Sequence, residues 1–487
     1  MKTGFDNEKY LKMQSEHIKE RIAQFDGKLY LEFGGKLLDD MHASRVLPGF
    51  EKDSKLQMLL QLKDQAEMIM VVSAVDVNNN KIRQDLGIGY DEDTIRLVRE
   101  YRDRGLYISS VVITKYTPGH TIEMFQSRLE KEDLKVYRHY LIPGYPTDIE
   151  TVLSDDGYGK NEYVETSRPL IVVTAPGPGS GKMSTCLSQI YNENKRGINA
   201  GYAKFETFPI WNLPLNHPVN LAYEAATADM NDINMIDPYH LKTYGVTTVN
   251  YNRDIEIFPV LRSIFEGIHG SSPYASPTDM GVNMAGNCII DDEVCREAGR
   301  QEIIRRYFQA AAGLAEGTKE PSELNKIKIL MNQEGLVPED RKVVAAARAL
   351  EKETGAVATV MELPDGTMIP GHTGDVMGPS AVCLIKAIKY LAGIPEDLKI
   401  LASDALAPIQ LLKIQYLGSR NPLLHPGEML TALSVTSSSD PQARKALEQL
   451  PRLKGCPVHT TARLAPHDIR TFKQLGCDLT YEPKEIR

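Results

Sequence analysis

No long apolar run occurs in the 487 residues, and none approaches the roughly 18 apolar residues of a membrane-spanning helix. The N-terminal residues 1–25 carry charges throughout and lack the apolar core of a secretory signal peptide. The six cysteines are scattered without a CxxC pair, a usage typical of reduced thiols. We therefore expect a cytoplasmic protein that has no membrane partner.

Basic residues are also too few for a general nucleic-acid binder. The chain has 56 Lys and Arg against 65 Asp and Glu, which gives a net charge of −9. Proteins that bind nucleic acids take most of their affinity from clustered cations facing phosphates. We expect no nucleic-acid partner, although a local basic pocket remains compatible with this charge.

Common hydrolase and metal motifs are missing. The chain has no HExxH sequence and no GxSxG sequence. Cys456, His459, His467 and Cys477 could form a ligand set, but their spacing matches no standard zinc pattern. We therefore expect no metal site.

What the sequence does contain is a regular alternation of strands and helices over its first part. Such an order predicts a doubly wound, mainly parallel α/β sheet. The apolar periodicity predicts helices at 8–25, 55–65, 92–104, 120–130 and 182–194, and strands at 29–33, 68–75, 107–114, 135–142 and 170–174.

Two further regions follow. Residues 212–300 are helical and loop-rich, which predicts an insertion. The polar segment Gly317–Ser322 suggests a boundary, so we expect an α/β domain over 1–320 and a smaller C-terminal α/β domain over 321–487. In the second domain, Asp365-Gly366 predicts a hairpin turn, and Ser380 is a candidate helix cap.

The most informative segment runs from Leu170 to Ser188 and predicts a strand, a glycine-rich turn and the start of a helix. It departs from a Walker A loop, GxxxxGK[ST], at both outer positions. Pro176 stands in place of the first glycine, and Met183 in place of the hydroxyl residue that holds magnesium. The residues left for binding a phosphate or cofactor are Gly177, Gly179, Ser180, Gly181, Lys182, Ser184 and Thr185.

This segment still favours an anion site. Glycines allow successive N–H groups to turn toward an oxyanion, the helix N-terminus adds partial positive charge, and Lys182 adds a full one. The alternative is a strand-to-helix turn that merely needs flexible residues. Ser184 or Thr185 would have to replace the missing magnesium ligand.

Residues that directly follow two of the predicted strands are weaker candidates for a ligand-binding site. Gly34, Gly35 and Lys36 end the first strand at a sheet edge where ligands commonly bind. Asp76 follows the second strand, as a metal-holding or a capping residue would.

Two further segments carry charged residues among aromatic ones. They are Tyr202–Thr207 and Tyr223–Asp229. The polar stripe of the second segment, with Asp232, indicates either a pocket or a solvated face.

Asp375 lies in a glycine-rich polar loop, 371–380, that precedes a predicted helix. It is the second catalytic candidate beside Lys182. Lys182 would neutralise charge on a phosphoryl oxygen, and Asp375 would serve as a base or metal ligand.

These features predict an enzyme that binds a nucleotide or another phosphorylated small molecule. A kinase or ligase would use ATP with magnesium. The alternatives are a transferase or isomerase of a phosphorylated substrate, which uses no ATP hydrolysis, and a non-catalytic sensor. We also expect a homo-oligomer.

Five segments resemble one bacterial protein family of unknown function, and the resemblance extends over the whole chain. They are 29–50, 83–91, 172–189, 223–241 and 371–381. The resemblance implies a cytoplasmic, bacterial, two-domain α/β protein. Some members carry the label of ATP-dependent peptidase, which no motif in this sequence supports, and the family supplies no catalytic residues to carry over.

Overall fold

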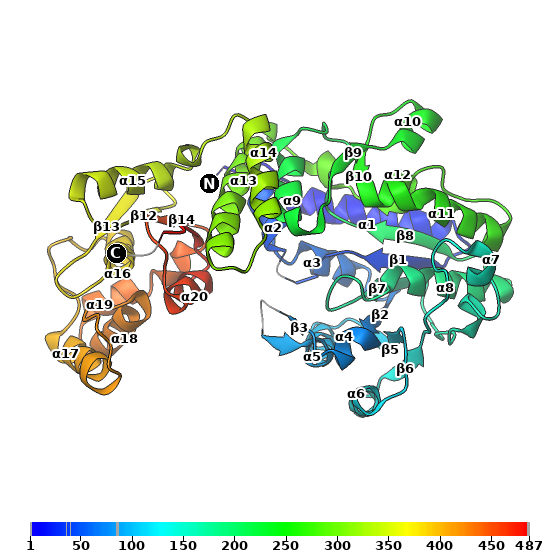
Figure 1. Cartoon of the computed structure of the whole chain (residues 1–487), viewed down its shortest axis with the longest axis horizontal. Coiled ribbons are helices and arrows are strands. Elements are labelled where there is room, and N and C mark those ends of the chain that lie inside the picture. The colour runs from blue at the N-terminus through cyan, green and yellow to red at the C-terminus, as the bar shows by residue number, and fades with distance from the viewer. Residues whose placement is uncertain (1, 36, 39, 84–86, 485–487) are drawn as a thin grey trace. The chain divides into compact units, whose positions relative to one another are not determined.

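The computed structural model describes residues 2–35, 37–38, 40–83 and 87–484 (Figure 1). Contacts between residues divide the chain into two units. The sheet unit comprises Lys2–Glu224 and Asn231–Gly299, and the C-terminal unit comprises Ala225–Met230 and Arg300–Arg487. The predicted boundary at residue 320 stays a prediction, because a division by contacts does not locate an independently folding domain.

The sheet unit is built on seven parallel strands. They are β1 (Leu29–Phe33), β2 (Ala66–Ser73), β5 (Ile108–Thr114), β6 (Lys135–Arg138), β7 (Leu170–Thr174), β8 (Gly201–Phe205) and β11 (Gly281–Val282). Their order is β11-β8-β1-β7-β2-β5-β6. Every residue of β1, β2 and β7 is buried, as expected of central parallel strands whose two faces are covered. The predicted mainly parallel α/β sheet is confirmed.

Helices cover both faces because the connections run in both directions along the sheet. The chain passes from β2 to β5 through α5 (Tyr90–Asp103) and from β7 to β8 through α8 (Lys182–Lys195). These two steps point to opposite edges, so right-handed crossovers place the helices on opposite faces. The carboxyl end of β7 is therefore a topological switch point, where open α/β sheets usually bind ligands.

The remaining elements of the sheet unit precede, connect or follow these strands. They are α1 (Asn7–Ala23), α2 (Met41–Val46), α3 (Ser54–Gln61), α4 (Ala74–Asn78), β3 (Ile82–Arg83), β4 (Ile88–Gly89), α6 (His120–Lys131), α7 (Ile149–Val152), α9 (Pro218–Ala226), β9 (Asn234–Ile236), α10 (Pro238–Tyr244), β10 (Val249–Tyr251), α11 (Asn252–His269) and α12 (Pro277–Met280). The elements from α9 to α12 lie between β8 and β11 in sequence and form the helical, loop-rich insertion that was predicted.

Two strand predictions were wrong in detail. Residues 74–75 belong to α4 rather than to the preceding strand, and the strand that begins at Lys135 ends at Arg138. In addition, β8 was not predicted. Its apolar pattern is interrupted by Lys204, which the structure places in a pocket rather than in solvent.

The C-terminal unit carries a four-stranded mixed sheet. Its strands β12 (Ala358–Glu362), β13 (Met368–His372), β14 (Pro457–Thr460) and β15 (Asp478–Tyr481) have the order β13-β12-β14-β15. The helices are α13 (Asp292–Ala315), which begins in the sheet unit, α14 (Pro321–Gln333), α15 (Lys342–Thr354), α16 (Pro379–Ala392), α17 (Ser403–Leu411), α18 (Pro426–Thr436), α19 (Pro441–Leu447) and α20 (Pro466–Gln474).

The predicted turn at Asp365-Gly366 does join two antiparallel strands, β12 and β13. Gly366 has φ +87°, a value that favours glycine. The capping prediction for Ser380 was wrong. The helix α16 begins one residue earlier, at Pro379, and its N-cap is Gly378, because proline suits the first helical position.

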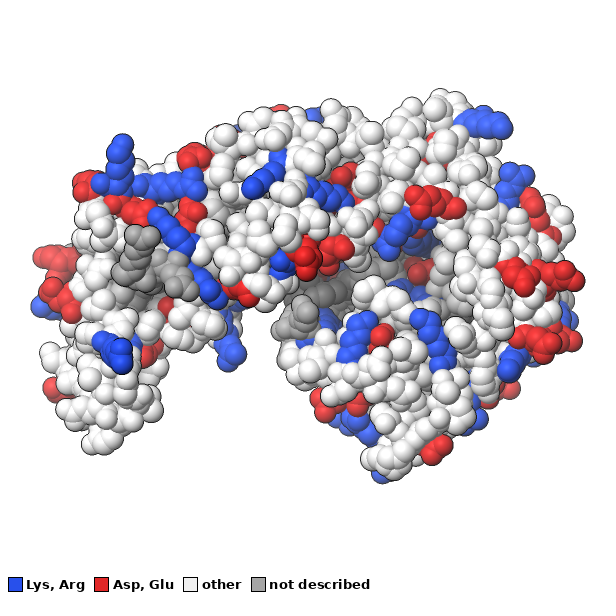
Figure 2. All heavy atoms as spheres, viewed as in Figure 1, with Lys and Arg blue, Asp and Glu red and all other residues white. Residues whose placement is uncertain are grey.

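Charged side chains of both signs are interspersed on the face shown in Figure 2. Among the described residues, no helix combines the length and the apolar character needed to cross a membrane.

Candidate functional site

The glycine-rich loop, residues 175–181, joins β7 to α8 at the switch point. Gly179 and Gly181 have φ values of +74° and +94°, the left-handed region that glycine adopts at least cost. Ser180 is fully buried and its hydroxyl donates to the carbonyl of Gly177 at 2.8 Å. The carbonyl of Ser180 accepts a hydrogen bond of 2.6 Å from the hydroxyl of Thr114, at the end of β5. These bonds fix the shape of the loop.

Gly177 is needed for a different reason. A Cβ atom at this position would lie 2.3 Å from the hydroxyl oxygen of Tyr90, the first residue of α5. No carbon atom can approach that closely, so any other residue would displace either the loop or the tyrosine. The glycine at 177 therefore allows the loop to pack directly against α5.

The loop offers a row of unused hydrogen-bond donors. The backbone N–H groups from Gly179 to Met183 have no acceptor within the part of the chain that the structure describes. They lead into the N-terminus of α8, a helix of 14 residues that adds partial positive charge. Lys182 forms no ion pair with any described residue. Donors and charge together suit an anion.

The two hydroxyl residues in the first turns of α8 differ in their surroundings. Ser184 is half-buried. Thr185 is fully buried, and its hydroxyl has no hydrogen-bond partner among the described residues.

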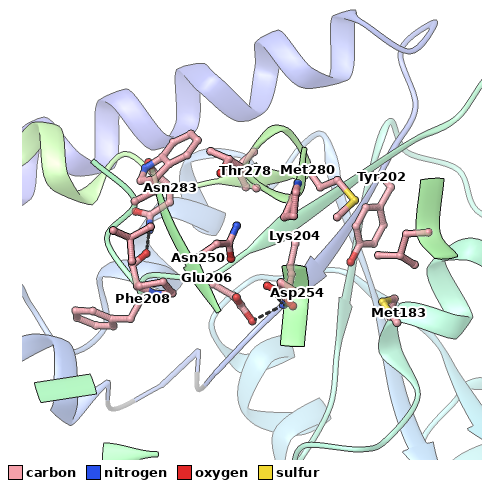
Figure 3. Close-up of a pocket in the computed structure, with 17 residues that line it drawn as sticks. Met183, Tyr202, Lys204, Glu206, Phe208, Asn250, Asp254, Thr278, Met280 and Asn283 are labelled. Carbon is pink, nitrogen blue, oxygen red and sulfur yellow. Dashed lines mark hydrogen bonds and ion pairs between the residues drawn. The ribbon is translucent and has the colours of Figure 1, made fainter. Parts of the chain in front are cut away.

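A pocket begins beside the same helix turn. It has a cavity volume of about 60 Å³, and Met183 lines it together with residues of β8 and α11 (Figure 3). Tyr202, Lys204 and Glu206 alternate along β8 and the residue after it, and so point to one face. Asp254 comes from the first turn of α11.

The side chains in this pocket form a charge cluster. Lys204 Nζ lies 2.7 Å from each carboxylate oxygen of Asp254 and 3.0 Å from Glu206 Oε1. Glu32 of β1 is the register partner of Lys204 and accepts a hydrogen bond of 2.6 Å from the hydroxyl of Tyr202. The ammonium group of Lys204 thus lies near the carboxylates of Asp254, Glu206 and Glu32. The side chain of Lys204 is 21% exposed.

The cluster changes the protonation behaviour of its members. Burial opposes the charged form of Lys204, but the carboxylates of Asp254 and Glu206 more than compensate and raise its pKa. Burial raises the pKa of Glu206 to about 7, against the opposing effect of Lys204 and with the support of Asp254. A carboxyl group with this pKa can both donate and accept a proton near neutral pH.

Gly34 and Gly35, which follow β1, lie next to this cluster. A Cβ atom at Gly34 would be 2.9 Å from Glu206 Cγ, and one at Gly35 would be 3.2 Å from Lys55 Nζ. Lys55 is buried and pairs with Asp40 at 2.7 Å. Gly34 thus brings the main chain close to the side chain of Glu206, and Gly35 brings it close to the ammonium group of Lys55. Lys36 lies outside the described residues.

Comparison with known proteins gives the chain a family. Residues 3–335 match the model described as "Domain of unknown function DUF1846, N-terminal", and residues 339–485 match the corresponding C-terminal model. The chain belongs to the DUF1846 family. A "UPF0371 protein" of Streptococcus thermophilus is 54% identical over 482 residues, which cover 99% of this chain and 98% of the relative.

Relatives from other bacteria are similarly close. A "UPF0371 protein" of Streptococcus pneumoniae is 52% identical over 482 residues, with the same coverage of 99% and 98%. Another, from Corynebacterium urealyticum, is 54% identical over 485 residues, again covering 99% of this chain and 98% of the relative. The family predicted from the five segments is thereby confirmed.

In this DUF1846 chain, the other catalytic candidate lies in the C-terminal unit. Asp375 is exposed in the loop between β13 and α16. Its role as a base or metal ligand stays a prediction.

Three further polar candidates have partners within the fold. Asp76 pairs with Lys81 at 3.2 Å, and Asp232 pairs with Arg253 at 2.6 Å. Glu224 accepts a hydrogen bond from the backbone N–H of Asn234. Such contacts are typical of residues that stabilise loops and helix ends.

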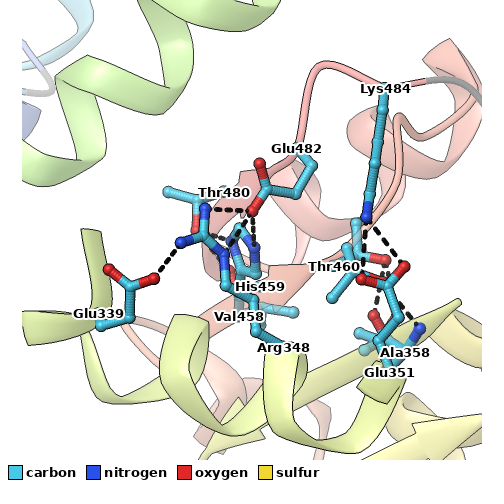
Figure 4. A network of polar contacts seen from close by, with 12 residues as sticks. Glu339, Arg348, Glu351, Ala358, Val458, His459, Thr460, Thr480, Glu482 and Lys484 are labelled. Atoms are coloured by element: carbon cyan, nitrogen blue, oxygen red, sulfur yellow. Dashed lines mark hydrogen bonds and ion pairs between the residues drawn. The ribbon is translucent and has the colours of Figure 1, made fainter. Parts of the chain in front are cut away.

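The structure does not bring the four residues of the possible zinc set together as one ligand group among the described residues, although Cys456 and Cys477 share one hydrophobic cluster. Cys456 and Cys477 are buried free thiols, while His467 lies near Asp468. His459 Nδ1 contacts the hydroxyl of Thr480 at 2.9 Å, inside a polar network that also joins Arg348 and Glu482 at 2.6 Å (Figure 4).

Sequence reasoning singled out the segment that contains Lys204 and Glu206 but assigned it no site. Asp254 was missed altogether. It lies 50 residues after Lys204 in a helix whose sequence is ordinary, so no local pattern marks it.

Proposed function

We propose that this chain is an enzyme that acts on a phosphorylated small molecule by acid–base chemistry. The proposal rests on one observation: the glycine-rich loop and the pocket that contains Glu206 adjoin each other at Met183. Met183 follows Lys182 in the first turn of α8, directly after the glycine-rich loop, and it also lines the pocket that holds Glu206. A phosphate on the loop would leave the rest of a small ligand free to enter that pocket.

Each group has a role in this proposal. The free N–H groups of the loop and the ammonium group of Lys182 bind the phosphate. Glu206, with its pKa of about 7, transfers the proton. Lys204 stabilises negative charge that develops on the substrate, and Asp254 keeps Lys204 charged and in position.

A second candidate function is ATP-dependent phosphoryl transfer, as in a small-molecule kinase or ligase. Strand, loop and helix occur in the order that phosphate loops use. The buried, unpartnered hydroxyl of Thr185 favours this candidate, because a magnesium ion would need a hydroxyl ligand that Met183 cannot supply. The first candidate needs no such replacement, and we prefer it for that reason.

The proposal includes a cytoplasmic location, which the six unbridged and buried cysteines support. Homo-oligomer formation stays a prediction.

Replacing Lys182 with alanine tests the phosphate site. We expect the affinity for inorganic phosphate, pyrophosphate and ATP to fall about 10- to 100-fold, because a hydrogen bond to a charged group contributes about 1.5–3 kcal/mol. Isothermal titration calorimetry, with and without magnesium, measures this change. Lys195→Ala is the matched control, since Lys195 is exposed in the last turn of the same helix.

Equal affinities in the wild type and Lys182→Ala would refute the loop as the anion site. Failure of ATP and ADP to bind in the presence of magnesium, with phosphate still bound, would eliminate the kinase or ligase. Turnover in a pool of phosphorylated metabolites separates an enzyme from a sensor, and we expect Glu206→Gln to abolish turnover while the pool still binds.

A further inference from the structure

Two histidines and one aspartate meet in the C-terminal unit, at the starts of two neighbouring helices. His425 is the N-cap residue of α18, and His467 and Asp468 lie in the first turn of α20. His425 Nδ1 is 2.9 Å from Asp468 Oδ2, and His467 Nε2 is 3.4 Å from Asp468 Oδ1. The two imidazole rings stand edge to face with centroids 4.4 Å apart.

The aspartate is the unusual member of this cluster. Asp468 is only 3% exposed, yet its Oδ1 atom makes no hydrogen bond with any described residue. A buried carboxylate oxygen normally has a partner, because removing it from water is costly. His467 Nε2 faces this oxygen at a distance longer than a good hydrogen bond.

The three side chains are spaced as the ligands of one metal ion would be. Each offers a ligand atom, and these atoms all lie within 4.8 Å of one another, the one such group found among the described residues. In a tetrahedral zinc site with bonds of about 2.1 Å, neighbouring ligand atoms are about 3.4 Å apart. The separations between the ligand atoms here run from 2.9 Å to at most 4.8 Å, a range that includes this value.

We propose that His425, His467 and Asp468 bind one divalent transition-metal ion, with Zn²⁺ as the preferred ion. Two imidazoles and one carboxylate are a ligand set that zinc accepts, and they leave at least one coordination position for water. The side chain of His467 is 60% exposed, so the ion would reach the site from solvent.

The spacing of these residues along the sequence could not reveal the set. His425 and Asp468 are 43 residues apart, and a gap of that length matches no short zinc motif. Only the packing of α18 with α20 brings the ligands together.

An ion pair beside the cluster helps to hold His425 in place. Lys413, the nearby cation, is held by Glu428 at 2.8 Å and by the carbonyl of Leu423 at 2.6 Å. Glu428 also accepts a hydrogen bond from the backbone N–H of His425 at 2.8 Å. These bonds fix the position of His425 and leave Asp468 as the carboxylate available to an ion.

The test uses the full-length protein after treatment with a chelator. We expect the wild type to bind one equivalent of Zn²⁺ in a competition titration against a chromophoric chelator, and one equivalent of Co²⁺ with visible absorption bands. His467→Ala should weaken both at least about 10-fold, the usual loss for a disturbed metal site. Its side chain is exposed, so the variant is expected to fold, and far-ultraviolet circular dichroism checks this.

His372→Ala is the matched control, because His372 is an exposed histidine elsewhere in the same unit. It should bind both ions as the wild type does, and Lys182→Ala should as well. No binding of either ion by the wild type would overturn the proposal. So would a His467→Ala variant whose affinities equal those of the wild type, or a His372→Ala variant that loses as much.

Discussion

Replacing Lys204 with methionine is expected to lower the free energy of unfolding of the sheet unit by about 1–3 kcal/mol. This lies between the cost of breaking an exposed ion pair and that of removing one partner from a buried pair, because the three charged side chains are about one-fifth to one-third exposed. The variant keeps most of the side-chain volume but leaves Asp254 and Glu206 without their cation. Urea denaturation followed by the fluorescence of Trp211 measures the effect, because the single tryptophan lies in this unit.

The loss should also depend on pH. Burial already raises the pKa of Glu206 to about 7, and Lys204 opposes that rise, so the pKa should be higher still in the variant. A carboxyl group with a raised folded-state pKa favours the folded state at low pH and loses that contribution as pH increases. The deficit at pH 8 should therefore exceed that at pH 6.

Lys195→Met is the control for this experiment. It breaks an exposed pair with Asp155 and should change stability little. A similar loss in both variants would contradict the assignment of a partly buried charge cluster.

His139 should make the sheet unit sensitive to acid. Burial lowers the pKa of His139 from 6.5 to about 4, and its Nε2 atom lies 3.2 Å from the carbonyl oxygen of Glu162. The unfolded chain takes up a proton near pH 6.5, whereas the folded chain does so only near pH 4. Stability should thus fall as pH decreases through this window, by about 3 kcal/mol at most, since one pKa unit corresponds to about 1.36 kcal/mol.

Urea midpoints of Trp211 fluorescence between pH 7 and pH 4.5 measure this slope. His139→Gln removes the titrating group and should flatten the profile, while His120→Gln, at an exposed position, should leave it unchanged. Parallel profiles for the wild type and His139→Gln would show that other groups cause the acid sensitivity.

The sheet and its loop could be predicted because both depend on local patterns. Leu170–Thr174 is a continuous apolar run, and the glycines after it mark a turn before a helix. The strand β8 was harder, since Lys204 interrupts its apolar pattern. A lysine in a parallel strand is understood only when its ion-pair partner from another element is known, and for Lys204 that partner is Asp254 of α11.

The pocket could not be predicted for a related reason. Asp254 reaches Lys204 only because the chain after β8 returns to the sheet through α11. In the same way, the requirement for glycine at 177 comes from Tyr90, which is distant in sequence and touches it only in the fold. The contact between His425 and Asp468 arises likewise from the packing of α18 with α20.

The bonds from Thr114 and Ser180 have a consequence for the thermodynamics of binding. They hold the glycine-rich loop in one conformation without any help from a ligand. An anion that binds there would order little additional chain, so little conformational entropy would oppose it. We expect inorganic phosphate to bind to the wild type with only a small unfavourable entropy change. Thr114→Val removes the bond to Ser180 and should make the entropy of phosphate binding more unfavourable.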